Sequence, residues 1–476
     1  MTRISPSHRT TALAFIGLVC LWPCLESFVT RRFRAALGLS EFALSSEWGK
    51  VILGCTVLAT SCILALLYAR KVLPTSSRHQ CAIVGIAGFL CFGASSITAN
   101  ASLFGPLITA LAPIALVIVG AYLSIAVVAW GSLLATLDAQ RSLLLVVLSN
   151  LVAFIAEALL NGVPGDTLLY VLVLCPLASS ACWIAWRKRL PQGVHHSTHA
   201  LAKELAPLPW PTIALVFGLI CFEDIFSRIL FGRHEGWPRD TLAITLVLCG
   251  GICALLAVLA WRSRTAQAAV QRSLSLLLAL YMAALLVTVL LPNSPALSAE
   301  RVMVAAGTGL RIYLWMLLTY AACTHRVSAV PAFLVYNALV LSLPISSMFT
   351  FSAESSPVPH GMQRLWEPGA IVSIAGIALF VVAMLAMIAS SRRQDAVQRA
   401  SSSPLADLTR EAGLSDRETQ VFELLLKGFS AKVAAQKLGV AESTVVTHTT
   451  HIYRKLKVSS RQELLQLAER YQGERS

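Results

Sequence analysis

The sequence predicts an all-α protein in two parts: a polytopic membrane bundle of twelve helices in residues 1–390, and a four-helix domain in residues 413–476, joined by a polar linker, 391–412. Charged residues make up 13% of the 476 residues, about half of the ~25% usual in soluble domains. Apolar runs of about 20 residues, the length that a helix needs to cross a bilayer, recur throughout the first part. The C-terminal domain is the only long stretch not dominated by apolar residues.

The apolar runs divide into twelve predicted spans. Their approximate limits are 11–29, 51–69, 81–100, 107–135, 142–160, 167–186, 210–231, 241–261, 273–291, 303–323, 329–350 and 369–390. The longest central connection, 187–209, has a basic start and a proline-rich end, and indicates a cytoplasmic linker between two halves, 11–186 and 210–390. No cleavable signal is expected, because the first apolar run lacks a small-residue cleavage site.

The distribution of Lys and Arg predicts the orientation of the bundle. With the N-terminus inside, sixteen basic residues fall in or beside inner loops and eight fall on the outer side, although the RRFR sequence of the first outer loop departs from the rule. Residues 405–476 hold 11 basic and 9 acidic residues, so most of the net charge of +14 lies in the membrane part. We therefore expect a multi-pass protein of the bacterial cytoplasmic (inner) membrane with both termini in the cytoplasm.

Six plus six spans with a long central connection and both ends inside resemble the major facilitator architecture. The resemblance rests on the number and arrangement of the spans in residues 1–390. In such transporters the loop between the second and third spans usually carries a Gly-rich turn with Asp and Arg. Here that loop is ARKVLPTSSRH, without Gly or Asp, and this departure argues against transport activity.

Start and stop residues predict four helices in the C-terminal domain. Ser415 and Glu418 have the spacing of a capping box, which opens the first helix, and Gly428 ends it. The other limits follow the same residue types: a second helix from Ser430 to near Leu438, a turn at Gly439, a third helix from about Glu442 to Leu456, and a fourth from Ser459 or Ser460.

The third helix has an apolar and a polar face. Its predicted buried stripe consists of residues spaced by four, three and four positions, namely Val445, Thr449, Ile452 and Leu456. The opposite face carries Ser443, Val446, Thr447, Thr450 and Arg454. Small polar side chains near the start of a helix and cations near its end suit insertion into a DNA major groove with anchoring on phosphates.

Several short motifs at fixed spacings closely resemble the LuxR-type helix-turn-helix. They are Leu414-Ser-Asp-Arg417-Glu418, Gly428-Phe-Ser430, Ala435-x-x-Leu438-Gly-Val440, Glu442-x-Thr444-Val445-x-x-His448, Ile452-Tyr453-x-Lys455-Leu456 and Ser459-Ser-Arg461. The resemblance implies binding of double-stranded DNA, with the third helix in the major groove and the fourth in a dimer contact. The chain has Ala441, Val446 and Lys457 where the family commonly has Ser, Lys and Gly.

Candidate DNA-contacting residues follow from the third helix and this resemblance: Ser443, Thr444, Val446, Thr447, His448, Thr450, His451, Arg454, Lys455 and Lys457. We expect the cations Arg454 and Lys455 to hold phosphates and the threonines to face bases. A homodimer on DNA is expected, because paired half-sites are the usual way for one small helix-turn-helix to gain affinity. The predicted pairing surface is the apolar side of the fourth helix: Leu464, Leu465 and Ala468.

Ionisable residues inside predicted spans are costly in lipid and indicate a functional site. Most of them lie in the outer half of their spans under the predicted topology, which suggests a hydrated cavity open to the outside. The candidate ligand-sensing residues are Glu26, Glu223, Asp224, Arg228 and Arg311, with Glu157 as a further charge in a span. Asp224 and Arg228 are four apart and can pair along one helix, so a contact between spans seven and ten would pair Glu223 with Arg311. The alternative is an ion-pair network with a structural role only.

The sequence thus predicts a membrane-embedded, ligand-responsive transcriptional regulator, with membrane lipid, operator DNA and a small-molecule inducer as partners. This arrangement resembles the membrane-embedded LuxR-type regulators of some gut actinobacteria. The alternative is a secondary transporter with a fused regulatory tail; an enzyme is not expected, since no nucleophile motif or phosphate loop is present. No cofactor and no metal site are predicted, because His195, His196 and His199 suit a solvated loop and the twelve cysteines lie in apolar runs.

Overall fold

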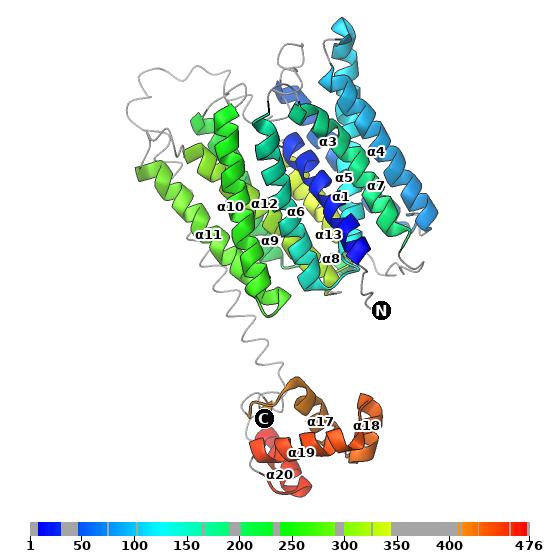
Figure 1. The fold of residues 1–476 in the computed structure, drawn as a ribbon, viewed down its shortest axis with the longest axis vertical. Coiled ribbons are helices and arrows are strands. Elements are labelled where there is room, and N and C mark those ends of the chain that lie inside the picture. The colour runs from blue at the N-terminus through cyan, green and yellow to red at the C-terminus, as the bar shows by residue number, and fades with distance from the viewer. Residues whose placement is uncertain are drawn as a thin grey trace. The chain divides into compact units, whose positions relative to one another are not determined.

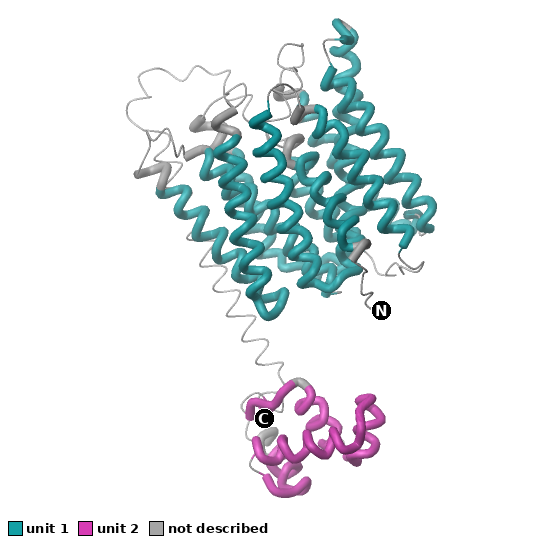
Figure 2. Tube along the Cα trace, viewed as in Figure 1, with its two compact units in different colours: residues 1–383 teal, residues 384–476 magenta. Residues whose placement is uncertain are grey.

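The computed structural model describes residues 8–29, 46–73, 76–100, 103–163, 167–189, 201–231, 239–290, 299–324, 327–343, 408–409, 412–426, 428–456 and 458–473. Within these ranges every regular element is a helix, so the predicted all-α class is confirmed for them (Figure 1). The chain divides into two compact units, Met1–Ala383 and Met384–Ser476 (Figure 2).

The helices of unit 1 match the predicted spans closely. They are α1 (His8–Val29), α3 (Ser46–Ala69), α4 (Ser77–Ala99), α5 (Ile108–Leu134), α6 (Ala139–Asn161), α7 (Thr167–Arg187), the short α8 (Leu201–Leu205), α9 (Trp210–Phe231), α10 (Arg239–Arg262), α11 (Ala266–Leu290), α12 (Ala299–Cys323) and α13 (Ala329–Tyr336). A 3₁₀ turn, η2 (Gly105–Leu107), precedes α5, and a π-helical turn, η3 (Asn337–Leu341), continues α13. The eleventh span is described as far as residue 343, and the twelfth, 369–390, lies outside the described residues.

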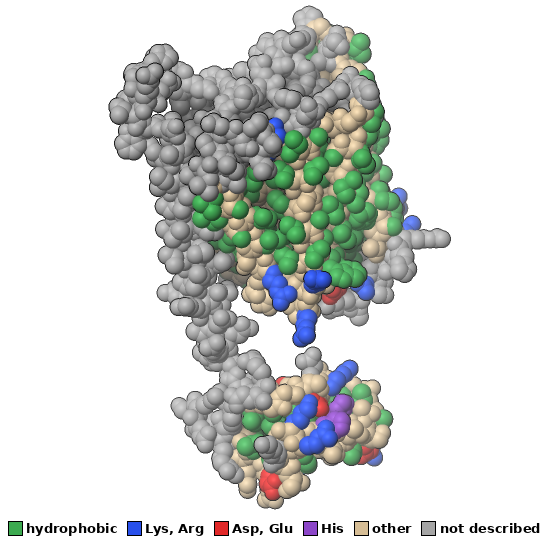
Figure 3. Space-filling model, turned by 60° about the vertical axis from the view of Figure 1, so that its left-hand side comes forward, with side chains coloured by type: hydrophobic (Ala, Val, Ile, Leu, Met, Phe, Trp, Pro, Cys, Tyr) green, Lys and Arg blue, Asp and Glu red, His purple; other side chains and the backbone are tan. Residues whose placement is uncertain are grey.

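Lipid is the solvent that the surface of unit 1 requires. Eight of the described helices are long and apolar enough to cross a membrane. Phe89, Leu174 and Val247 lie near the middle of such helices with exposed side chains, an arrangement that is unfavourable in water. Figure 3 shows apolar side chains over one face of this unit and Lys and Arg gathered at one end. Unit 1 is therefore a multi-pass membrane domain.

The two halves of unit 1 pack against each other along several helix pairs. In the first half, α1 packs on α6 and α7, and α4 packs on α5 and α7; in the second, α12 packs on α9, α10 and α11. Between the halves, α6 runs beside α10 and α5 beside α13 (Figure 1). Asn337 of η3 donates a hydrogen bond from Nδ2 to the Ser124 carbonyl of α5 (3.1 Å), deep in this seam.

Further bonds join the halves at the end of the bundle that the predicted topology assigns to the cytoplasm. The Gln140 amide, at the start of α6, donates to the Ala260 carbonyl of α10. Near it, the Cys323 thiol at the end of α12 donates to the Leu134 carbonyl of α5, with Sγ 3.5 Å from the oxygen. The described halves are thus held together at this end.

Unit 2 contains α17 (Asp416–Leu426), α18 (Ala431–Leu438), α19 (Glu442–Leu456) and α20 (Arg461–Gly473). These helices surround a core of their own. Its buried members are Leu408, Val421, Phe422, Leu425, Ala434, Ala435, Val445, Ile452 and Leu464. The bounds of α19 are those predicted from the sequence, and α18 and α20 start where the serine caps indicated.

Candidate nucleic-acid interface and buried ion pair

A reciprocal capping box opens the first helix of unit 2, as predicted. The Ser415 backbone N–H donates to Glu418 Oε2 (2.7 Å), and the Glu418 N–H donates to Ser415 Oγ (3.3 Å). Two backbone donors that the helix cannot satisfy itself are thereby satisfied. These two bonds define the start of α17.

The turn between α18 and α19 is built on two local features. Ser430 caps α18, with its Oγ accepting from the Val433 N–H (3.4 Å). Gly439 ends α18 with φ of +65°, the left-handed region that favours glycine. The sharp reversal presents α19 across the other helices as a helix-turn-helix.

The two faces of α19 are those predicted. Val445 and Ile452 are fully buried, and Leu456 is half-buried against the same core. The side chains on the opposite face are exposed: Ser443, Val446, Thr447, Thr450 and Arg454. The Thr447 and Thr450 hydroxyls donate to the Ser443 and Val446 carbonyls one turn earlier, which leaves the hydroxyl lone pairs directed outward.

Lys455 has an intramolecular role that the sequence did not reveal. Its Nζ lies 2.6 Å from Glu418 Oε2 and donates to the Gly413 carbonyl at 2.9 Å. The ammonium, followed by the Ser415 N–H, lowers the pKa of the Glu418 carboxyl to about 2. The Lys455 ammonium is thus already paired with groups of its own module. Of the two cations, the exposed Arg454 is the better placed to bind a phosphate.

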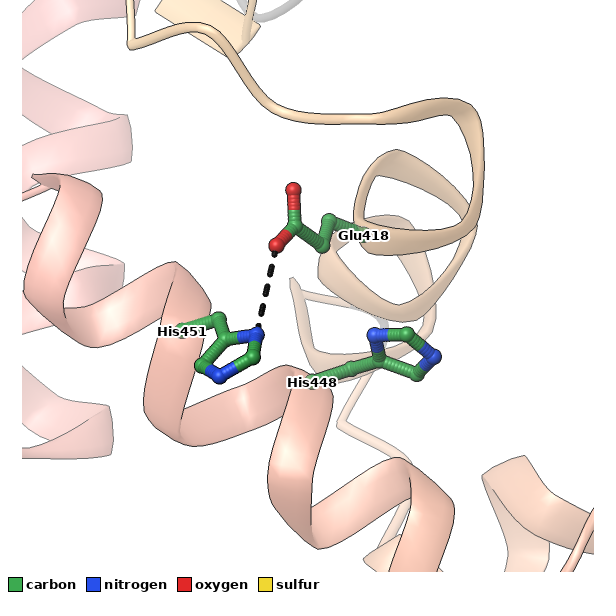
Figure 4. A group of neighbouring side chains, drawn as sticks. All are labelled: Glu418, His448 and His451. Atoms are coloured by element: carbon green, nitrogen blue, oxygen red, sulfur yellow. Dashed lines mark ion pairs between the residues drawn. The ribbon is translucent and has the colours of Figure 1, made fainter.

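The remaining DNA candidates lie beside this face or outside the described residues. Thr444 is exposed near the start of α19, whereas His448 and His451 are half-buried on the flank next to α17. His451 Nδ1 lies 3.7 Å from Glu418 Oε1 (Figure 4). The Lys457 side chain lies outside the described residues.

Unit 1 contains the predicted ion pair between spans seven and ten. Arg311 of α12 donates to Glu223 of α9, with Nη2 2.7 Å from Oε2, and both side chains are buried. Gly307 lies one turn before Arg311, and a Cβ at this position would be 2.6 Å from Glu223 Oε2. The absence of a side chain at Gly307 therefore allows the carboxylate to lie against α12.

The other candidate sensing residues are less well described. Asp224 is half-buried and has electrostatic or hydrogen-bonding neighbours. The side chains of Glu26 and Arg228 lie outside the described residues, so the proposed Asp224–Arg228 pair stays a prediction. Glu157 is buried near the end of α6.

An aromatic cluster lies one turn along α12 from Arg311. The Trp315 ring is 4.8 Å from the Trp22 ring and 5.0 Å from the rings of Phe333 and Tyr336, measured between centroids. Trp22 belongs to α1 and the other two partners to α13, so the cluster joins the two halves at the centre of the bundle. The Trp315 indole N–H is buried and has no acceptor among the described residues.

Comparison with known proteins assigns the C-terminal module. Residues 412–468 match the family described as bacterial regulatory proteins, luxR family. The C-terminal module is a LuxR-family domain. Curated relatives include the HTH-type transcriptional regulator MalT of Vibrio cholerae, 28% identical over 28% of this chain and 15% of its own length. Another is the response regulator TodT of Pseudomonas putida, 40% identical over 16% of this chain and 34% of its own length. The chain thus spans about a third or less of these relatives.

Solved structures show the fold of the membrane unit. A bacterial homologue of the iron transporter ferroportin, in an outward-facing state, has a TM-score of 0.54 at 13% identity, over 81% of this chain and 100% of its own. The D-xylose–proton symporter has a TM-score of 0.50 at 12% identity, over 79% and 96%. The major-facilitator-like fold expected from the sequence is thereby confirmed, although the full count of twelve spans reaches beyond the described residues.

One expectation about the LuxR-family module is wrong. Leu464 and Ala468 do not form an apolar surface for pairing, because both are buried, and Leu464 belongs to the core. An apolar stripe predicts that a helix packs against another surface, but it does not identify that surface. Here the stripe packs against the other helices of the same module. Leu465 is half-buried outside this core and remains a candidate for a dimer contact.

Arg461 has a structural role in the module that its place in the Ser459-Ser-Arg461 motif did not predict. Its Nη2 donates to the carbonyls of Leu425 (3.1 Å) and Phe429 (3.2 Å), at the end of α17 and just beyond it. The Leu425 carbonyl lies in the last turn of α17 and the Phe429 carbonyl lies beyond it, where helix-internal donors are lacking. The start of α20 is thereby held against the end of α17.

Proposed function

We propose that this chain is a membrane-embedded transcriptional regulator that binds double-stranded promoter DNA through α19 and changes its output when a small molecule binds the membrane unit. The observation that carries the proposal is the exposed polar face of α19 on a LuxR-family core, in a chain whose other unit is a multi-pass membrane fold. The proposal includes no catalysis. It places the chain in the bacterial inner membrane with both termini in the cytoplasm, where DNA is accessible.

The alternative of a secondary transporter with a regulatory tail has less support. Likeness in fold at 12–13% identity says nothing about what crosses the membrane. The loop between α3 and α4 also departs from the turn of such transporters. Uptake of labelled sugars or ions by membrane vesicles that contain the chain would favour the transporter.

The DNA prediction concerns the phosphate-facing cations and the base-facing threonines. Arg454→Ala is expected to weaken binding to every sequence and to reduce the slope of log K against log salt by about one. Thr450→Val, which removes a hydroxyl at constant size, is expected to change base preference and leave the salt slope unaltered. Fluorescence anisotropy of the detergent-solubilised chain on a promoter library, at several salt concentrations, measures both quantities.

The opposite pattern would contradict this assignment: a change of base preference in Arg454→Ala with the salt slope retained. Lys455→Ala is a less specific variant, because it also removes the partner of Glu418. We expect Lys455→Ala to lower both phosphate affinity and the stability of the module. Comparison of its thermal unfolding with that of Arg454→Ala separates the two effects.

Coupling between ligand and DNA requires a membrane unit with two states that the ligand distinguishes. The buried pair Glu223–Arg311 and the aromatic cluster around Trp315 join different helices at the centre of the bundle. The bonds from Gln140 and Cys323 close the proposed cytoplasmic end. We infer that a ligand entering from outside acts on the central groups and that the cytoplasmic end opens in response.

This inference predicts that Gln140→Ala increases exposure of Cys323. Cys323 is buried beside Leu134 in the wild type, and loss of the α6–α10 bond should increase its rate of maleimide modification several-fold, as followed by mass spectrometry of its peptide. Gln80→Ala is the matched control, since Gln80 accepts from Arg187 within one half. Equal rates in wild type and Gln140→Ala would show that this bond does not keep the end closed.

A further inference from the structure

Two histidines and a glutamate converge on the flank of the LuxR-family module (Figure 4). His448 and His451 are three positions apart on α19 and so lie on one side of the helix, while Glu418 comes from the first turn of α17. One potential ligand atom from each of the three lies within 4.8 Å of the other two. Glu418 Oε1 lies 3.7 Å from His451 Nδ1.

His448 provides a second, independent observation. Its Nδ1 is buried and has no hydrogen-bond partner among the described residues. Buried polar atoms are nearly always satisfied, and an exception indicates a missing ion, water or ligand. Figure 4 shows a ring nitrogen of each histidine on the side toward Glu418. A cation held between these groups would satisfy the orphaned nitrogen.

The donor set and its spacing fit a zinc-class ion. Imidazole nitrogens and a carboxylate oxygen bind Zn²⁺ at ~2.0–2.2 Å, and a tetrahedral ion therefore sets its ligand atoms roughly 3.4 Å apart. The widest separation, at most 4.8 Å, must shrink by no more than about 1.4 Å, which rotation of the two half-buried imidazoles can provide. Lys455 occupies Glu418 Oε2, and the other oxygen, Oε1, faces His451.

We propose that Glu418, His448 and His451 bind one divalent transition-metal ion of the zinc class, with the fourth position open to water. The ion would connect the first turn of α17 to the middle of α19 and add positive charge beside the exposed face of α19. The binding itself depends only on the geometry of the module and not on the proposed response to a ligand or to DNA. Zinc occupancy would thus be a second input to the module, separate from the membrane unit.

The test uses the full chain in detergent, purified without a polyhistidine tag. Titration with Co²⁺ followed by visible absorption, and with Zn²⁺ by calorimetry, is expected to show one ion per chain. His451→Asn and His448→Asn should each weaken binding by about tenfold or more, since even changes beside the ligands of a metal site have effects of this size. His451 has a side chain that is 42% exposed, so His451→Asn should fold normally and is the decisive variant.

Two control variants separate this site from adventitious binding to histidine. His79→Asn removes a lone exposed histidine of α4, and a triple His195→Asn, His196→Asn, His199→Asn variant removes the histidines of the central linker. Both should bind the ion as the wild type does. The proposal is overturned if the wild type binds no ion at micromolar concentration, if His451→Asn binds as tightly as the wild type, or if only the triple variant loses binding.

Discussion

An Arg311→Ala protein is expected to unfold in detergent at a clearly lower temperature than the wild type. The change leaves the Glu223 carboxylate buried without the guanidinium that lies 2.7 Å away. Removal of one partner of a buried ion pair typically costs ~3–5 kcal/mol. Fluorescence-detected size-exclusion chromatography after heating measures the loss.

Replacing both partners should separate folding from sensing. The double variant Glu223→Gln with Arg311→Gln leaves no uncompensated charge and can retain a hydrogen bond between the two amides. We expect it to be expressed and inserted like the wild type, but to give reporter transcription that no longer follows the growth condition or compound that alters wild-type output. Normal regulation in the double variant would mean that the pair is structural, and the ligand-sensing assignment would then be dropped.

Two glycines provide matched tests of the same pair. Gly307→Ala inserts a Cβ within 2.6 Å of Glu223 Oε2 and should displace the carboxylate from Arg311, with a loss of stability similar in sign to that of Arg311→Ala. Gly218→Ala places its Cβ in α9, the helix of Glu223, where nothing lies within 4 Å. The Gly218→Ala variant should have the unfolding temperature and the transcriptional response of the wild type.

Leu464→Glu is expected to unfold the LuxR-family module and abolish DNA binding. Leu464 is 1% exposed within the core formed by all four helices. Truncation of a buried leucine to alanine alone costs ~2–5 kcal/mol, and an unpaired charge in the same place costs more. Loss of the helical unfolding transition of the module, followed by circular dichroism, tests this expectation.

Leu465→Glu is the matched variant for dimer formation. Leu465 follows Leu464 directly but is half-buried outside the core, and a glutamate there should leave the module folded. If α20 provides the contact between two copies on paired half-sites, this variant should shorten the footprint on DNA to one half-site. A full-length footprint that survives Leu465→Glu would argue against pairing through α20.

The features that the sequence predicted correctly are mainly local ones. The limits of α19 follow from a glycine turn, the position of Glu442 and an apolar repeat, all within one short stretch. The capping box of Ser415 and Glu418 depends on residues three apart. The Glu223–Arg311 contact is a long-range success with a simple reason: charges in lipid require partners, and few are available.

The features that were missed depend on tertiary packing. Lys455 and Glu418 are 37 positions apart. Neither sequence segment predicts that the end of α19 contacts the start of α17. Leu464 was assigned to a dimer surface because the apolar stripe of a helix does not show whether it packs inside the module or against a second copy. The convergence of His448 and His451 on Glu418 has a sequence signal, the i, i+3 histidines, but the carboxylate belongs to another helix.

The hydrogen bond from Lys455 to the Gly413 carbonyl has a mechanical consequence. Gly413 and Ser415 lie between the buried Leu408 and the start of α17, and both are connected to the last turn of α19, directly or through Glu418. A displacement of the chain before α17 would therefore reach the DNA-facing helix through Lys455 as well as through the core residue Leu408. The rates of amide hydrogen exchange at Ser415 and in the last turn of α19 should then change together, because the two segments are connected through Glu418 and Lys455.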